Sequence, residues 1–357
     1  MSLEILWLAL LGLLLAGYFV LGGYDYGVQM LSPFLGGRGP DPVGGTADPA
    51  THTDPAPDAV PGWHNAALDA IAPFFLGNEV WLVAFAGTMF GAFPHLEGNL
   101  LSGLYPLFVA ILVGLVLGNA AVQLRGRSRD PEALRRWDVL VVLGGVLPAV
   151  CWGIVVGLLL RGVPRRADNS FHVGVGDVLA PFPLTCGVAV ALLFAGHGAA
   201  FVALRSDAEL AATARRLGVR LLAGSGAASG LALVLSLLGA GASTTRTTTS
   251  VVLFGLVAVA LAAGRRFLSR GRDALAFTAT CVATALPVPL IGAGQYPYLL
   301  TASSGAGITV HDAAADHATL ELLIGFGVVI FPLILAYQTW SWWAFRGRTG
   351  MRHAGYF

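Results

Sequence analysis

The feature that most limits the fold of this chain is a series of long apolar stretches that carry almost no charge. A membrane-spanning helix needs about 20 mostly apolar residues in a row, and the 357-residue sequence contains nine such stretches. We therefore predict an all-α, polytopic membrane protein that forms one integral membrane domain over residues 1–357. The expected spans are about Leu3–Gln29, Ala66–Phe93, Leu100–Gln123, Asp138–Leu160, Asp177–Leu204, Val219–Gly241, Ser250–Phe267, Ala274–Gly294 and Thr319–Phe345.

The composition excludes several other classes of protein. Charged residues make up only 11% of the chain, against roughly 25% in a typical soluble domain, so its side chains cannot cover a water-facing surface. The apolar content excludes a disordered chain, and three cysteines do not make a secreted disulfide scaffold. The 21 basic residues nearly balance the 20 acidic ones, so we expect no nucleic-acid partner.

The positions of the basic residues predict the orientation in the membrane. All 21 are arginine, and with nine spans 17 of them fall on the side of the first loop and 4 on the other side. Arginine is enriched in cytoplasmic loops, so we expect the N-terminus outside and the C-terminus in the cytoplasm. Residues 36–62 are rich in Pro, Gly and Asp, which predicts a flexible cytoplasmic loop.

Ionisable side chains inside apolar spans are costly, and they are therefore the first candidates for function. Asp25 lies near the expected cytoplasmic end of the first span, and Asp69 lies near the cytoplasmic start of the second. Glu79, beside Asn78, is expected near the middle of the second span. Carboxyl groups placed from the cytoplasmic end toward the middle of the membrane could transfer protons, because burial can raise the pKa of a carboxyl toward neutrality. The alternative is that Asp25 or Asp69 only caps a helix end near the headgroups.

The sequence gives little support for haem or metal binding by this chain. His197 is the one histidine expected deep in a span, and the sequence holds no histidine pair at helical spacing and no Cys-x-x-Cys motif. Because His197 stands between Gly196 and Gly198, we expect it to make a contact between helices. We predict no catalytic residue, no metal ligand and no directly bound cofactor. Other polar residues within or near the spans include Gln29, Asn119 and Gln338.

Four runs of residues are similar to those of a known family. Gly23–Leu31 and Ile71–Leu82 resemble the end of the first span and the second span of subunit II of cytochrome bd-type quinol oxidases. Ile308–Asp312 and Phe331–Trp340 resemble the segment before the last span and that span itself. Together these runs cover both ends of the chain, and the middle matches by its pattern of spans.

The resemblance implies a nine-helix fold of two four-helix bundles and one peripheral helix. It implies a heterodimer in the bacterial cell membrane with the haem-bearing subunit I, which holds b- and d-type haems, oxidises quinol and reduces oxygen to water. Membrane lipid surrounds the pair, and the family leaves room for a small accessory subunit. Subunit II itself carries no haem; it supports subunit I and lines a route for cytoplasmic protons.

The resemblance also bears on the candidate residues. Asp25 matches the family motif directly, whereas the role of Glu79 as a proton carrier is our inference from its position. Gly22 and Leu76 stand where the family usually has acidic residues. The proton route of this chain is therefore expected to depart from the family pattern.

Two other functions stay open from the sequence. The chain could be a free-standing transporter, but transporters more often have broken helices in corresponding halves around a polar site at the midplane. Here the deep polar residues gather in the first three expected spans. The chain could also be a purely structural subunit that conducts no protons.

Overall fold

The computed structural model describes residues 2–35, 63–127, 130–166, 168, 170–304 and 307–347. Within these residues, nine helical segments are long and apolar enough to span a membrane, which confirms the predicted all-α fold with nine spans. The predicted loop at 36–62 lies outside the described residues. The spans are α1 (Leu3–Leu35), α3 (Phe75–Ala92), α5 (Tyr105–Leu124), α6 (Pro131–Arg161), α8 (Pro181–Arg205), α9 (Ala208–Leu237), α10 (Thr247–Ser269), α11 with α12 (Asp273–Ala285 and Pro287–Gln295) and α14 (His317–Ala344).

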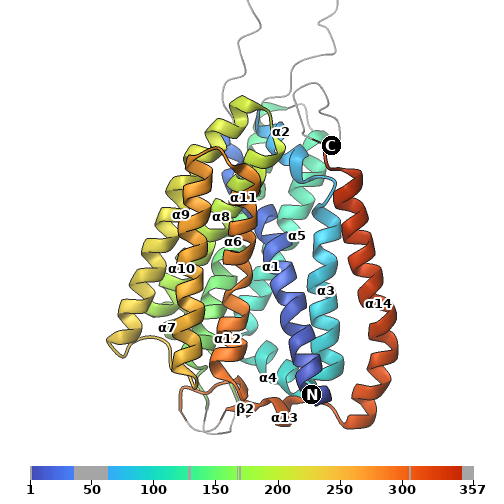
Figure 1. Ribbon diagram of the computed structural model, residues 1–357, viewed down its shortest axis with the longest axis vertical. Coiled ribbons are helices and arrows are strands. Elements are labelled where there is room, and N and C mark those ends of the chain that lie inside the picture. The colour runs from blue at the N-terminus through green and yellow to red at the C-terminus, as the bar shows by residue number, and fades with distance from the viewer. Residues whose placement is uncertain are drawn as a thin grey trace, which may run out of the picture.

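Shorter elements connect the spans at the two ends of the bundle. The helix α2 lies at the upper end in Figure 1, whereas α4, α13 and the strand β2 lie at the lower end. The two strands pair antiparallel. The bounds of these elements are α2 (Trp63–Ile71), α4 (Pro94–Gly103), the 3₁₀ turn η1 (Arg125–Arg127), α7 (Val175–Val178), α13 (Val310–Ala313), β1 (Tyr298–Leu300) and β2 (Ile308–Thr309).

Two of the predicted spans are broken, and in both cases proline explains the break. The expected second span divides into α2 and α3, which are separated by a turn that contains Pro73. The expected eighth span divides into α11 and α12 at Leu286, just before Pro287. Proline lacks a backbone N–H and cannot continue the hydrogen-bond ladder of a helix. The expected span Ala66–Phe93 therefore begins later in the structure, at Phe75, and α2 precedes it.

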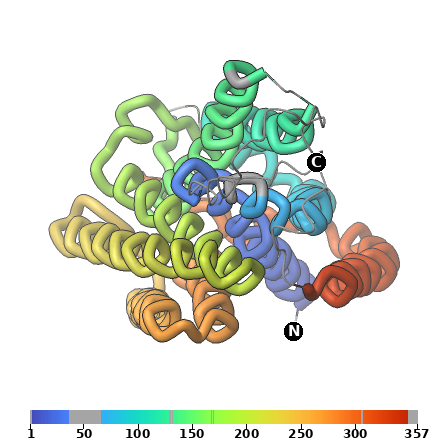
Figure 2. The backbone as a smooth tube through the Cα atoms, turned by 90° about the horizontal axis from the view of Figure 1, so that it is seen from above, coloured from blue at the N-terminus to red at the C-terminus, as the bar shows by residue number. Residues whose placement is uncertain are grey.

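The first span, α1, lies in the middle of the molecule (Figure 2). It contacts α3, α6, α8 and α11. The last span, α14, lies at the periphery against α3, and only 11% of its most apolar stretch is buried. The start of α1 and the end of α14 lie at opposite ends of the bundle (Figure 1). The division into two four-helix bundles stays a prediction.

Glycine allows α1 and α8 to cross at very short range. A Cβ atom at Gly27 would overlap the carbonyl oxygen of Phe194 and would lie 2.9 Å from the Cα atom of Gly198. Small residues at such crossings let the backbones of membrane helices pack closely. This crossing fixes the part of α1 that carries the candidate residue Asp25.

Candidate functional site

The structure joins two of the predicted site residues, Asp25 and Asn78. The side chain of Asp25 on α1 is only 4% exposed, and that of Asn78 on α3 is fully buried. Asn78 Nδ2 donates to Asp25 Oδ2 at 2.8 Å and to the hydroxyl of Tyr24 at 2.6 Å. Asp25 Oδ1 has no hydrogen-bond partner in the described part of the chain. Because a buried ionised oxygen without a donor is unfavourable, Oδ1 is the atom available to take a proton.

Glu79 follows Asn78 on α3 but faces another helix. Asn119 Nδ2 on α5 donates a hydrogen bond to Glu79 Oε1. Successive residues of a helix point about 100° apart, so Asn78 reaches α1 while Glu79 reaches α5. The buried amide of Gln29 lies beside α5 too, since a Cβ atom at Gly118 would lie 2.5 Å from its Oε1 atom.

The predicted depth of Glu79 requires a correction. We expected it near the middle of a span that begins at Ala66, but the spanning helix α3 begins at Phe75. Glu79 is its fifth residue, about 6 Å along the helix axis from that start. The turn around Pro73 moves the start of the span toward Glu79. Asp25 lies at the same level of the bundle, because its carboxyl group accepts from Asn78, the residue before Glu79, and α1 continues beyond it to Leu35.

Asp69 is set apart from the other candidates. It lies on α2, which precedes the spanning helix α3, and its side chain is buried. Burial raises the pKa of the Asp69 carboxyl to about 6, and the positive charge of Arg125 opposes this rise. Asp69 is therefore able to exchange a proton near neutral pH.

Replacing Asp69 by asparagine is expected to stabilise the protein more at pH 8 than at pH 5. The folded-state pKa of about 6 lies above the value of about 3.9 for an unfolded aspartate. The cost of the charged form is absent below pH ~4, grows between the two values and is complete above pH ~6. Thermal unfolding of the purified protein at both pH values measures this difference. An Asp69→Asn gain that is equal at pH 5 and pH 8 would contradict the assignment, and Asp168→Asn, at an exposed carboxyl, is the control.

The two positions that depart from the family pattern have defined surroundings. Leu76 is 62% exposed and lines a cavity of about 370 Å³ together with Gln123 and Arg127. At Gly22, a Cβ atom would lie 2.9 Å from the ring of Tyr18. The cavity is thus bordered by the apolar side chain of Leu76, and the ring of Tyr18 fills the space beside Gly22.

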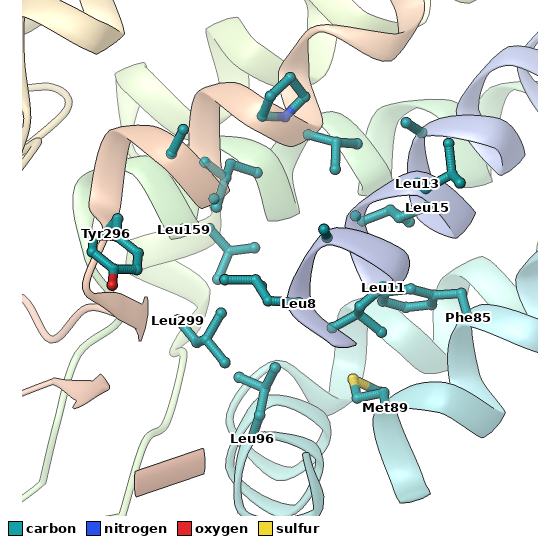
Figure 3. A pocket seen from close by; sticks show the side chains of 18 of the residues that line it. Leu8, Leu11, Leu13, Leu15, Phe85, Met89, Leu96, Leu159, Tyr296 and Leu299 are labelled. Atoms are coloured by element: carbon teal, nitrogen blue, oxygen red, sulfur yellow. The ribbon is translucent and has the colours of Figure 1, made fainter. Parts of the chain in front are cut away.

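A second, larger cavity of about 730 Å³, shown in Figure 3, has no aspartate or glutamate among its lining residues in the described part of the chain. It is lined by Leu8, Leu11 and Leu15 in the first half of α1, and by side chains of α3, α4 and α12. Arg246 and Tyr296 are among its few polar lining residues. Such a lining favours binding of an apolar molecule, and it offers few groups that could pass protons.

His197 makes the predicted contact between helices. Its Nδ1 atom lies 2.8 Å from Thr280 Oγ1 on α11, and its Nε2 atom lies 2.9 Å from the carbonyl oxygen of Val20 on α1. Both ring nitrogens are thus engaged by protein atoms. The described residues contain no group of three or more potential metal-ligating side chains. The ring of His197 is held between α1, α8 and α11 by protein hydrogen bonds.

Sequence reasoning missed how α14 joins the site. Gln338 Nε2 donates to Asn78 Oδ1 at 3.2 Å, and Trp81 Nε1 donates to Gln338 Oε1 at 3.3 Å. The sequence feature that could have indicated this contact is the amide of Gln338 within an apolar span, because such a group needs a partner on another helix. The sequence identified Gln338 as polar but not as a neighbour of Asn78.

The whole chain matches a known family. Residues 3–345 match the family model described as cytochrome bd terminal oxidase subunit II. The chain belongs to this family. The resemblance predicted from the sequence is confirmed, and members of the family are subunits of cytochrome bd ubiquinol oxidase, an oxygen-reducing oxidoreductase complex.

Individual relatives extend over nearly the full length of the chain. Cytochrome bd ubiquinol oxidase subunit 2 of Bacillus subtilis (strain 168) is 29% identical over 349 residues, which are 97% of each protein. Cytochrome bd-I ubiquinol oxidase subunit 2 of Escherichia coli (strain K12) is 26% identical over 97% of this chain and 95% of that protein. A chain of the bd oxidase from Geobacillus thermodenitrificans has the same fold, with a TM-score of 0.72 at 18% identity over 94% of this chain and 96% of that one.

Membership of the subunit II family has three direct consequences. A second subunit implies a first as its partner. A cytochrome bd oxidase complex depends on haem. The nine apolar segments and the family together make the chain a multi-pass membrane protein. The roles of Asp25, Asn78, Glu79 and Asp69 stay predictions.

Proposed function

We propose that this chain is the non-haem subunit of a quinol:oxygen oxidoreductase of the bacterial respiratory chain, and that it carries cytoplasmic protons toward its partner. In this proposal, subunit I holds the b- and d-type haems, oxidises quinol and reduces oxygen to water. Oxygen reduction consumes protons, so the reaction needs a supply from one side of the membrane. Because protein atoms already engage both ring nitrogens of His197, this histidine supports placing the haems in the partner.

The observation that carries the proton role is the buried pair of Asp25 and Asn78. One oxygen of the Asp25 carboxyl accepts from Asn78, and the other has no protein donor in the described residues. A carboxyl held by a single amide donor can exist both ionised and protonated at membrane depth. The structural alternative, an aspartate that only caps a helix end, is disfavoured because α1 continues ten residues beyond Asp25.

The proposed route begins at the end of the bundle that carries α2. Asp69, with its pKa of about 6, and the cavity beside Leu76 and Gln123 are the first sites. Glu79 with Asn119 and Asp25 with Asn78 follow, at about the same level among the spans. The route thus passes Leu76 without an acid at that position.

The orientation of the chain follows from its arginines. We propose that the end with α2 faces the cytoplasm, because 17 of the 21 arginines fall on that side. The N-terminus then lies outside and the C-terminus inside. The many exposed apolar side chains of α3, α5 and α14 face lipid, subunit I and, as the family allows, a small accessory subunit.

Purification tests the assignment of the chain to this complex. Extracted from its native membrane in mild detergent, the chain is expected to elute with a larger haem-bearing subunit and to show b- and d-type haem absorption. Isolation of the chain alone without haem would contradict the proposal and would favour the free-standing transporter.

Replacing Glu79 by glutamine is expected to slow oxygen consumption by roughly tenfold or less, the lower part of the range for groups that transfer protons. Glutamine keeps an acceptor for Asn119 but cannot release a proton, so the haem spectrum stays intact. Quinol-dependent oxygen uptake by the purified complex measures the change. The exposed Glu321 provides a matched Glu→Gln control, and a Glu79→Gln complex as fast as this control would remove Glu79 from the route.

A further inference from the structure

A series of hydrogen bonds links the peripheral helix α14 to the carboxyl group of Asp25. Trp81 Nε1 donates to Gln338 Oε1 at 3.3 Å, and Gln338 Nε2 donates to Asn78 Oδ1 at 3.2 Å. Asn78 Nδ2 then donates to Asp25 Oδ2 at 2.8 Å. These four residues come from α3, α14, α3 again and α1.

Trp81, at the outer end of this series, sets the direction of its hydrogen bonds. An indole N–H can only donate, so Gln338 must turn its oxygen toward Trp81 and its NH₂ group toward Asn78. Asn78 must then turn its oxygen toward Gln338, and its NH₂ group faces Asp25 and the hydroxyl of Tyr24. Reversing any amide in the series would bring two donors or two acceptors together.

Close packing holds the Trp81 indole and the segment around Gln338 in place. A Cβ atom at Gly17 on α1 would overlap the ring of Trp81, so the indole lies directly on the α1 backbone. A Cβ atom at Gly77 on α3 would lie 2.9 Å from the ring of Tyr337, the residue before Gln338. The indole and the Gln338 amide are therefore held in fixed positions relative to Asn78.

We propose that Trp81 and Gln338 are positioning residues that keep the Asn78 amide turned with its N–H donor toward Asp25, and thereby set how tightly Asp25 holds a proton. A donor stabilises the ionised carboxylate, whereas an amide oxygen in its place would stabilise the protonated acid. Without Gln338 the Asn78 oxygen loses its donor, and only Asp25, Tyr24 and the carbonyl oxygen of Leu21, 3.4 Å from Asn78 Nδ2, hold the amide in its orientation. The Asn78 amide then turns over more often, and Asp25 holds its proton to higher pH. The consequence for turnover rests on the proposed function of Asp25; the consequence for its protonation does not.

Other charged or titratable groups near Asp25 stay unchanged when Gln338 is replaced. Glu79 on α3 interacts with Asp25 through its charge. Titratable groups near Asp25 on its own helix α1 are Tyr18, Tyr24 and Tyr26. Groups on the other neighbouring elements are Asp69 on α2, His197 and Arg205 on α8, and Cys281 on α11.

The test measures Asp25 in the assembled complex by infrared spectroscopy. The C=O absorption of protonated Asp25 is identified as the band that Asp25→Asn removes, and its intensity is followed from pH 5 to pH 10. In Gln338→Leu the midpoint is expected to rise by about one pH unit, the effect of losing one hydrogen bond to a charged group. Trp81→Phe frees the Gln338 amide and is expected to move the midpoint in the same direction by less.

A neighbouring substitution separates this role from general loosening of α14. Thr339→Val alters an exposed residue of α14 that bonds only to its own helix, and it is expected to leave the band unchanged. An unchanged Asp25 band in both Gln338→Leu and Trp81→Phe would overturn the inference. A shifted band together with normal turnover of Asp25→Asn would support the positioning role and refute the proposed proton function, so the two failures are distinct.

Discussion

Oxygen reduction is expected to slow by roughly a hundredfold when Asp25 is replaced by asparagine, the size of effect that follows loss of a group that transfers protons. Asparagine has the shape of aspartate and can accept from Asn78, but it cannot bind and release a proton. The complex should therefore assemble with its haem absorption intact. Quinol-dependent oxygen consumption by the purified complex measures the change.

The control for Asp25 is an aspartate outside the spans. Asp168→Asn changes an exposed carboxyl that bonds to Ser170 and is expected to leave turnover unchanged. Full activity of an assembled Asp25→Asn complex would leave the chain as a purely structural subunit. Loss of the haem signal together with activity would instead mean that Asp25 acts through assembly.

Assembly is expected to depend most strongly on the crossing of α1 and α8. In Gly27→Ala the added methyl group would overlap the carbonyl oxygen of Phe194, so the two helices must move apart. Overpacking of this kind costs about 1–3 kcal/mol or more. We expect a large fall in the yield of assembled complex and a lower melting temperature, and Gly198→Ala at the same crossing should behave alike.

A glycine outside the crossing provides the control. A Cβ atom at Gly255 on α10 would meet no atom within 4 Å, and alanine is the better helix former. Gly255→Ala is therefore expected to preserve or slightly raise stability. Equal yields of the Gly27→Ala and Gly255→Ala complexes would contradict the packing described for α1 and α8.

The sequence predicts the number of spans well because hydropathy reports directly on which residues can face lipid. It predicts the ends of the helices less well. The helix α1 continues six residues past Gln29 through the mostly apolar segment Met30–Leu35. The helix α9 begins at Ala208 and not at Val219, because good helix formers such as Ala, Glu, Leu and Arg precede its apolar stretch. The expected second span divides into two helices at the turn around Pro73.

The candidate site was predictable as a set of residues but not as an arrangement. Asp25 and Asn78 were recognisable because polar groups are rare in these spans. Their contact joins residues 53 positions apart, and the contact of Gln338 with Asn78 joins residues 260 positions apart. Periodicity along one helix does not show which face meets which neighbour. The close approach of Gly27 to Gly198, which fixes the position of α1, lies beyond a local pattern for the same reason.

The central claim is that protons for oxygen reduction pass through Asp25 from the side of the membrane that carries α2. Proton uptake by the reduced complex during its reaction with oxygen, measured in vesicles with a pH indicator on one side only, tests it most directly. We expect fast uptake from the α2 side, and much slower uptake from that side in Asp25→Asn with haem reduction unchanged. Equal uptake rates in the two complexes, or uptake from the opposite side, would contradict it.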